Sequence, residues 1–288
     1  MWYTMARIQQ NFLLSERLVR AIMDMRMVGS HNDDVEELIS LGADVNSLHG
    51  MLLPLQCACM VSDVETLRIL LDRGAAINST DGYGRAALHY AAERDVECVA
   101  ELLHQGAAPD IPDPNRDTPL HWAAFKNKSD CVRTLLECGA NVNALDFNSD
   151  SPLSWAAQKG NLESLKVLLQ YNARVSTKNL NGHYPVSRTA AIIALGLNSE
   201  KDDTCLDILL EAMGQFDIQT AEGTLPSPIC QDNRLVELFT KYCRRPRSLQ
   251  SQCRFRIRET LGQCYLPNVL PKLPIPDRLQ NYLMLLRD

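Results

Sequence analysis

The sequence lacks any apolar segment long enough to cross a membrane. A spanning helix needs roughly 18 or more consecutive apolar residues, and no run in these 288 residues approaches that length. The N-terminal stretch MWYTMARIQQNF also lacks the apolar run and the small-residue cleavage site of a signal peptide. We therefore expect a soluble intracellular protein, in the cytoplasm or in both cytoplasm and nucleus, with no membrane partner.

The ten cysteines include no CxxC pair, and the closest two are Cys57 and Cys59. A structural zinc site needs clustered Cys and His ligands, and a phosphate-binding loop needs closely spaced glycines. Neither pattern occurs in the sequence. We expect reduced thiols that pack as small apolar side chains, with no metal and no cofactor.

The net charge of −6 is distributed unevenly along the chain. Residues 241–288 contain ten Lys and Arg against three Asp and Glu, so the remainder carries −13. A basic segment can bind nucleic acid, but the arginines of RFRIR at 254–258 form neither a long basic stripe nor a stacking platform. The pattern favours a separate C-terminal module with its own protein partner, and no nucleic acid.

An internal repeat fills most of the chain. TPLHWA at 118–123 recurs as AALHYA at 86–91, SPLSWA at 151–156, LPLQCA at 53–58 and YPVSRT at 184–189, with starts spaced by 32 or 33 residues. A second motif, of the type LLECGANVN, keeps the same period. Its turn residues are Gly42, Gly74, Gly106, Gly139 and Asn172.

Each unit has the signals of two short helices. Thr or Ser caps the first helix, and Pro follows at the first helical position, where no amide hydrogen is needed. A second helix such as LESLKVLLQ at 162–170 should end at Gly or Asn in the left-handed conformation. Asp, Asn and Gly between units predict projecting hairpin loops. This pattern resembles the ankyrin repeat, a solenoid of stacked helix pairs.

The repeat divides the chain into four predicted regions. They are an N-terminal capping helix at 1–32, about six ankyrin repeats at 33–213, a connector helix at 214–247 and a C-terminal module at 248–288. The outer repeats are degenerate, and a sixth is expected from two helices on either side of residues 198–203. The predicted fold class is mainly all-α.

Two histidines in the repeats are candidates for chemistry. His89 and His121 share a motif position that Gln56, Ser154 and Ser187 occupy elsewhere. Exchange of His for Ser or Gln favours a structural hydrogen bond to loop backbone over a catalytic or ligand role. A nucleophile pair of Cys131 with His121 lacks an orienting third residue, so we expect no enzyme activity.

Three aromatic residues, Tyr90, Trp122 and Trp155, share one register of the repeat. They can pack between neighbouring repeats, or they can line a groove that anchors a partner, because aromatic residues dominate binding hot spots. Loop residues expected to project from the same side would complete a substrate surface: Tyr83, Arg85, Arg116, Phe147 and Asp150. Both interpretations remain open.

Residues 248–288 contain three short patterns. In SLQSQCRFRI, Leu249, Cys253 and Ile257 would form one apolar stripe of a helix, which either packs on the repeats or binds a partner. In LPKLPIP at 270–276, three prolines exclude ordinary core structure and predict an extended segment that exposes its leucines and isoleucine. DRLQNYLMLL, at 277–286, should form a second helix.

This order of patterns resembles a three-helix SOCS box. Ser248, Leu249, Cys253 and Ile257 match its Elongin-binding box, and the run Leu273, Pro274, Ile275 and Pro276 matches its cullin box. With the repeats, the chain resembles the ankyrin repeat and SOCS box family.

The resemblance implies a non-catalytic subunit of an E3 ubiquitin ligase. It would bind Elongin C and Elongin B, and cullin 5 with a RING-finger protein. The ankyrin stack would hold an unknown protein substrate, including through Tyr83, Arg85, Tyr90, Arg116, Trp122, Phe147 and Trp155. Ubiquitination and proteasomal degradation of that substrate would follow. The alternative is an ankyrin scaffold that recruits no ligase.

Overall fold

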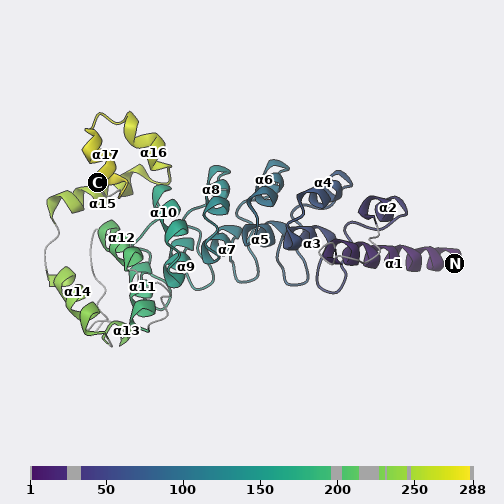
Figure 1. The fold of residues 1–288 in the computed structure, drawn as a ribbon, viewed down its shortest axis with the longest axis horizontal. Helices are drawn as coiled ribbons and strands as arrows, with labels where there is room; N and C mark the ends of the chain where they lie inside the picture. Colours follow the sequence, from purple (N-terminus) through teal and green to yellow (C-terminus); the bar gives the residue numbers. More distant parts are fainter. Residues whose placement is uncertain are drawn as a thin grey trace. The chain divides into compact units, whose positions relative to one another are not determined.

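The computed structural model of the chain describes residues 2–24, 34–195, 203–213, 227–230, 232–244 and 248–285 (Figure 1). These residues form helices and loops, with two isolated β-bridges, between His49 and Leu52 and between Thr80 and Ala86. The chain divides into two compact units. The N-terminal unit comprises residues 1–123 and 137–140, and the C-terminal unit comprises residues 124–136 and 141–288. The predicted mainly α-helical fold is confirmed.

The N-terminal unit begins with α1 (Trp2–Asp24), which packs on α2 (Val35–Ser40) and α3 (Pro54–Val61). Leu14, Leu18 and Ile22 are buried at a spacing of four residues, so one face of α1 covers the first repeat. Residues 25–33 lie outside the described part of the chain. The boundary of the capping region at residue 32 therefore stays a prediction.

Helix pairs follow in the order that the repeat predicts. In the N-terminal unit α3 pairs with α4 (Val64–Asp72) and α5 (Ala87–Ala92) pairs with α6 (Val96–His104). The first helices of these pairs stack on each other, as do the second helices. Helices α7 (Pro119–Phe125) and α8 (Ser129–Glu137) contribute residues to both units.

The C-terminal unit continues with α9 (Pro152–Lys159) and α10 (Leu162–Gln170). Next come α11 (Pro185–Ala194) and α12 (Thr204–Ala212), the two helices expected for a sixth, diverged repeat. Residues 196–202 between them lie outside the described residues. Helix α13 (Ser227–Cys230) contacts α11 and α14 (Asn233–Arg244), and α14 lies where the connector helix was predicted.

The C-terminal module contains α15 (Leu249–Leu261), α16 (Leu266–Val269), the 3₁₀ helix η1 (Leu270–Lys272) and α17 (Asp277–Leu283). Helix α15 contacts α17, and α16 and η1 form one continuous helical segment. The proposed boundaries of the module at 248 and 288 stay predictions, because the described residues end at 285.

The predicted helix ends are confirmed in part: the turns after the second helices form as predicted, but the cap positions of α3, α5 and α11 are Leu53, Ala86 and Tyr184, without a Ser or Thr cap. The Ser151 side chain accepts a hydrogen bond from the Ser154 amide at the start of α9, and Pro is the first residue of α3, α7, α9 and α11. The turn residues after the second helices all have positive φ. The angles are +107° at Gly42, +84° at Gly74, +92° at Gly106, +91° at Gly139 and +62° at Asn172. Asn tolerates this conformation better than other non-glycine residues.

Candidate functional site

Helix α15 has two faces of opposite character. It begins at Ser248, whose hydroxyl accepts a hydrogen bond from the Ser251 amide at 3.2 Å. The predicted apolar stripe lies on the open face: the Leu249 side chain is 76% exposed and Cys253 is also exposed. Ile257 is half-buried against a small core of Leu266, Leu270 and Leu283. The stripe is therefore not used to pack α15 on the repeats.

The buried face of α15 is polar, which differs from the apolar stripe predicted as its contact surface. Ser251, Arg254 and Arg258 are each 7% exposed. Their spacing of three and four residues is the spacing of one helix face, so the signal was present. Arginine is rarely buried, so this spacing alone did not predict a buried face. Each arginine must therefore be compensated by hydrogen bonds.

Arg258 obtains this compensation from the carboxyl ends of two helices. Its guanidinium donates to the Leu169 carbonyl of α10 at 2.6 Å and to the Leu283 carbonyl of α17 at 2.7 Å. The last carbonyls of a helix have no partner within the helix and carry its negative dipole end, which favours a cation. Burial, followed by the nearby charge of Arg254, lowers the pKa of Arg258 to about 10. The side chain is still cationic at neutral pH.

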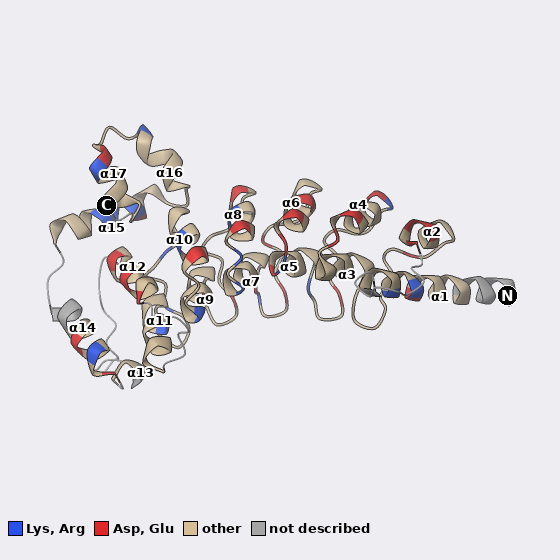
Figure 2. Cartoon of the chain, viewed as in Figure 1, with Lys and Arg blue, Asp and Glu red and all other residues tan. Residues whose placement is uncertain are grey.

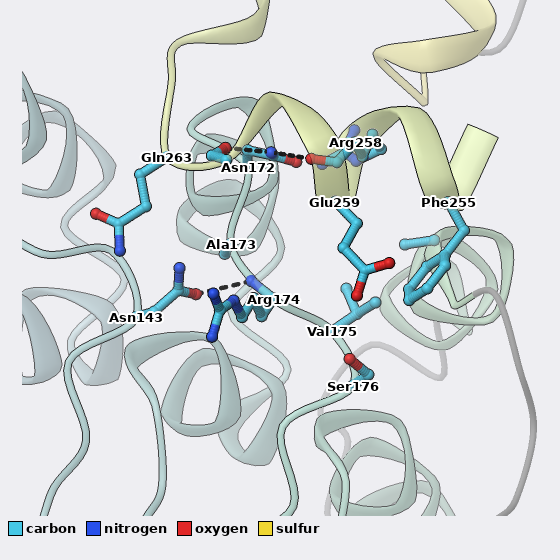
Figure 3. A pocket seen from close by; sticks show the side chains of 12 residues that line it. Asn143, Asn172, Ala173, Arg174, Val175, Ser176, Phe255, Arg258, Glu259 and Gln263 are labelled. Atoms are coloured by element: carbon cyan, nitrogen blue, oxygen red, sulfur yellow. Dashed lines mark hydrogen bonds between the residues drawn. The ribbon is translucent and has the colours of Figure 1, made fainter. Parts of the chain in front are cut away.

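Asn172 completes the contact from the other side. Its amide nitrogen donates to the Arg258 carbonyl at 2.6 Å and to the Gly262 carbonyl, both at the carboxyl end of α15 (Figure 3). Asn172 therefore caps α15 while the Arg258 side chain caps α10. We call Asn172 and Arg258 the reciprocal cap. The departure from glycine at this turn now has a physical explanation, because glycine has no side chain to donate.

Further contacts hold the module on the same part of the C-terminal unit. The rings of Tyr171 and Tyr265 stack with centroids 4.5 Å apart, and Gln263 donates to the Asn141 side chain at 2.9 Å. A pocket lies beside this seam and is lined by residues of α15 and of the loop after α10, among them Phe255, Glu259 and Arg174 (Figure 3).

Arg254 is the second anchor of α15. Its guanidinium donates to the Glu211 carbonyl of α12 and lies over the Tyr282 ring, 4.2 Å from the ring centroid. Burial lowers the pKa of Arg254 from its ordinary value. Since Glu211 belongs to α12 and Tyr282 to α17, Arg254 also connects α12 with the end of the module.

The proline-rich segment differs from its prediction. Leu270 is fully buried in the small core, and Leu270–Lys272 is a 3₁₀ helix, so the first half of the segment is neither extended nor exposed. Proline is accepted there because the first positions of a helix need no amide hydrogen. Leu273 and Ile275 are half-buried against the same core, and Pro274 and Pro276 are exposed. The exposed apolar surface is therefore smaller than predicted.

In the N-terminal unit, Arg85 is half-buried, although its place after a hairpin loop predicted that it projects. Its guanidinium lies 4.3 Å from the ring centroids of both Tyr90 and Trp122 and pairs with Glu93, and the side chain is only 17% exposed. Tyr90 is buried, and its hydroxyl donates to Asp81 at 2.6 Å. The cation–π contacts and the ion pair explain why Arg85 folds inward.

Tyr83 and Arg116, also in the N-terminal unit, are exposed as predicted. Their exposure does not show whether these side chains contact a substrate.

In the C-terminal unit, Phe147 is 68% exposed at the tip of its hairpin loop, and Trp155 is half-buried. Asp150 was expected to project, but it is 2% exposed, because Arg188 pairs with it at 3.1 Å and Asn179 donates to it. Burial raises the pKa of Asp150. Arg188 occupies the register of the aromatic residues in the degraded motif YPVSRT, and the motif predicted no ion pair there.

The histidines have the structural role that their exchange for Ser and Gln predicted. The Nδ1 atom of His89 accepts from the Ala86 amide at 3.1 Å, so its Nε2–H is free to donate to the Asp117 carbonyl, also at 3.1 Å. The Thr118 amide donates to Nδ1 of His121 in the same way. Burial lowers the pKa of His89, so the imidazole is neutral at pH 7.

The cysteines of the repeats are mostly enclosed. Cys131 is 2% exposed, and burial raises the pKa of Cys57 to about 12, which keeps that thiol protonated. In the described part of the chain no cluster of three His, Cys, Asp or Glu side chains could hold a metal ion. None of the described helices combines the length and hydropathy of a membrane span.

Comparison with known proteins adds two kinds of similarity. Models of ankyrin repeats match residues 22–113 and 94–179, and the SOCS box model matches residues 245–284. The chain is 61% identical to ankyrin repeat and SOCS box protein 8 of Mus musculus over 286 residues, 99% of this chain and 98% of the relative. It is 60% identical, with the same coverage, to the proteins of that name from Homo sapiens and Bos taurus.

Proposed function

Because this chain belongs to the ankyrin repeat and SOCS box family, we propose that it is a substrate receptor of a ubiquitin ligase built on Elongin B/C, cullin 5 and a RING-finger protein. A SOCS box joined to ankyrin repeats supports a substrate-adaptor role. The observation that carries the proposal is the exposure of Leu249 and Cys253 on a helix whose opposite face is anchored by two buried arginines.

The anchoring makes α15 suitable for docking. Arg254 and Arg258 fix the helix on the repeats and on α17, so its open face is held in place before a partner arrives. Preorganisation lowers the entropy lost on binding. Ile257 is already half-buried, so new burial comes mainly from Leu249 and Cys253. Enclosing these two side chains contributes roughly 3 kcal/mol gross, and Elongin C is the proposed partner.

The second part of the proposal concerns the proline-rich segment. Pro274 and Pro276 are exposed beside the half-buried Leu273 and Ile275, and we assign this surface to cullin 5. The small core beneath it, Leu266, Leu270 and Leu283, holds the segment in one conformation.

The chain would act by proximity. The ankyrin repeats would hold a protein substrate while the ligase brings a ubiquitin thioester near one of its lysines, which raises the effective concentration of the reacting groups. No side chain of this chain takes part in the chemistry of that transfer, so its role is non-catalytic. Degradation of the substrate by the proteasome would follow, in the cytoplasm or the nucleus.

Substrate contacts are proposed on the hairpin loops and first helices of the repeats. Tyr83 and Arg116 of the N-terminal unit and Phe147 of the C-terminal unit are exposed and available. Arg85, Tyr90, Trp122 and Trp155 would act mainly by shaping the surface, because each is buried or half-buried.

Co-purification from cells tests the proposal. Leu249→Asp should abolish retention of Elongin B/C and with it cullin 5, whereas Gln250→Ala, an exposed neighbour on α15, should retain both. Pro274→Ala should lose cullin 5 and keep Elongin. Both Leu249 and Pro274 are exposed, so neither change should unfold the protein, and thermal unfolding checks this. An ankyrin scaffold without ligase recruitment predicts no Elongin B/C with the unmodified chain.

A further inference from the structure

The first helices of the repeats in the C-terminal unit carry only positive charge. Lys159 is the one charged residue of α9 and Arg188 is the one charged residue of α11, and Lys126 directly follows α7. The second helices carry acidic residues, as on α8 and α12 (Figure 2). The whole chain has a net charge of −6, so composition alone does not explain positive first helices.

Two of these cations surround one aromatic ring. The ammonium nitrogens of Lys159 and Lys126 lie 4.5 Å and 5.6 Å from the centroid of the Phe125 ring. The Trp155 ring meets Phe125 edge-on at 5.5 Å. Both lysines are exposed, and both rings are half-buried. We call Phe125, Lys126, Trp155 and Lys159 the lysine–aromatic patch.

The contacts with the Phe125 ring keep the two positively charged ammonium groups, of Lys126 and Lys159, near each other. Because both nitrogens are measured to the same centroid, they are at most about 10 Å apart, roughly one Debye length at moderate salt. Their repulsion is therefore only partly screened, and a bound anion would relieve it. Cation–π contact limits the lysine rotamers, so less entropy is lost when the ammonium groups engage a ligand.

The nearby hairpin carboxylates are turned inward. Asp146 is 3% exposed and accepts from the Trp155 indole nitrogen at 3.0 Å, and Asp150 is 2% exposed and pairs with Arg188. Neither presents its negative charge to an incoming partner, so these two carboxylates add no exposed negative charge beside the patch.

An exposed apolar surface adjoins the patch. The bond from Trp155 to Asp146 places the patch beside the hairpin tip that carries Phe147, which is 68% exposed. The Leu180 amide donates to the Asn148 carbonyl at 2.9 Å, so the next hairpin lies alongside, and Leu180 is 70% exposed. A ligand that reaches from the lysines to the hairpin tips meets cations first and apolar side chains second.

We propose that the lysine–aromatic patch and the adjoining tips bind an acidic peptide segment of the substrate that also carries a bulky apolar residue. Carboxylates of the segment contact Lys126 and Lys159, and the apolar residue packs on Phe147 and Leu180. This inference rests on the proposed function, since it names the class of substrate that the receptor takes.

Two other polyanionic occupants fit the surface less well. Single-stranded nucleic acid needs aromatic faces on which bases stack, but the Phe125 face is approached by cations and the Trp155 indole is tied to Asp146. A second copy of this chain could offer its acidic second helices, but among the described residues α4, α6, α8, α10 and α12 expose no large apolar side chain for the hairpin tips. Both occupants are outcomes of the test.

The test measures binding of a fluorescent peptide of alternating Glu-Glu-Phe triplets to the full chain in complex with Elongin B/C. A matched peptide with Gln at every Glu position, and labelled oligouridylate, are the comparison probes. The variants are Lys126→Glu with Lys159→Glu, the milder Lys126→Gln with Lys159→Gln, and the control Lys166→Glu. Lys166 is a lysine of α10 in the same unit; its side chain is 43% exposed and pairs with Glu163.

The acidic peptide should bind the unmodified chain more weakly as salt increases. The double Glu variant should weaken it about tenfold or more, the Gln variant by less, and Lys166→Glu by less than about twofold. Equal binding of the acidic peptide to the chain and the double variants overturns the proposal. The proposal is also overturned if oligouridylate binds more tightly than the acidic peptide through the same lysines. It is overturned as well if the unmodified chain forms a dimer and the double variants are monomeric.

The two proposals fail separately. If the chain retains Elongin B/C and cullin 5 but does not bind the acidic peptide, only the proposed class of substrate is refuted. Absence of Elongin B/C from the purified unmodified chain refutes the receptor function itself.

Discussion

Replacing Asn172 with glycine should loosen α15 from the repeats and leave the repeat intact. Glycine adopts positive φ freely, so the turn after α10, at +62°, is not strained by the change. What is lost is the pair of hydrogen bonds that the Asn172 side chain donates to the carbonyls of Arg258 and Gly262.

The magnitude follows from these two bonds. At about 0.5–1.5 kcal/mol net each, their loss should reduce the local stability of α15 docking by roughly 1–3 kcal/mol. That corresponds to an increase of roughly 5- to 150-fold in the opening equilibrium that exposes α15 amides to exchange. Hydrogen–deuterium exchange with peptide resolution measures this for residues 249–261 and, in the same sample, for α10.

A second substitution separates hydrogen bonding from backbone effects. Asn172→Asp keeps the side-chain size and tolerates the left-handed conformation, but a carboxylate cannot donate and would face two carbonyl oxygens. It should open α15 more than glycine does. Unchanged exchange of α15 in Asn172→Gly would refute the reciprocal cap, and an equal loss of protection in α10 would show that the repeat itself had been weakened.

Three further predictions test other parts of the chain. Leu249→Ala should weaken Elongin B/C binding by roughly 30-fold, from about 2 kcal/mol of lost burial, without changing the melting temperature, because the side chain is 76% exposed. His89 is buried with a lowered pKa, so below its ordinary value of 6.5 the unfolded state binds a proton that the folded state does not. The free energy of unfolding should therefore fall as pH decreases from 7 to 5, and less so in His89→Gln, which copies Gln56 of the first unit. Tyr90→Phe removes a 2.6 Å bond to Asp81 and should lower the free energy of unfolding, followed in urea, by roughly 1.5–3 kcal/mol; an unchanged midpoint contradicts it.

Residues whose role is set within one repeat were predicted well. The turn glycines, the capping Ser151 and the leading prolines act on backbone groups only a few residues away, so a sequence motif contains everything that they need. The helix that starts at Ser248 and its open stripe belong to the same class, because a stripe is a property of one helix.

Residues whose role depends on distant chain segments were predicted poorly. Arg258 is separated by 89 residues from the Leu169 carbonyl that it binds. Its spacing from Ser251 and Arg254 places it on another helix face than the exposed Arg256, but the spacing does not show which of these faces is buried. Arg85 was expected at the surface because it follows a hairpin loop. Two aromatic rings and Glu93 draw it inward instead.

The sequence by itself determined the repeat architecture, the family resemblance and the position of the apolar stripe, since each follows from periodicity and local backbone chemistry. The tertiary structure alone decided which face of α15 is anchored, why Asn172 replaces glycine and which charges remain at the surface. Those answers depend on burial. A buried arginine is stable only where distant helices present carbonyl oxygens to it, and that arrangement is a property of the packed chain.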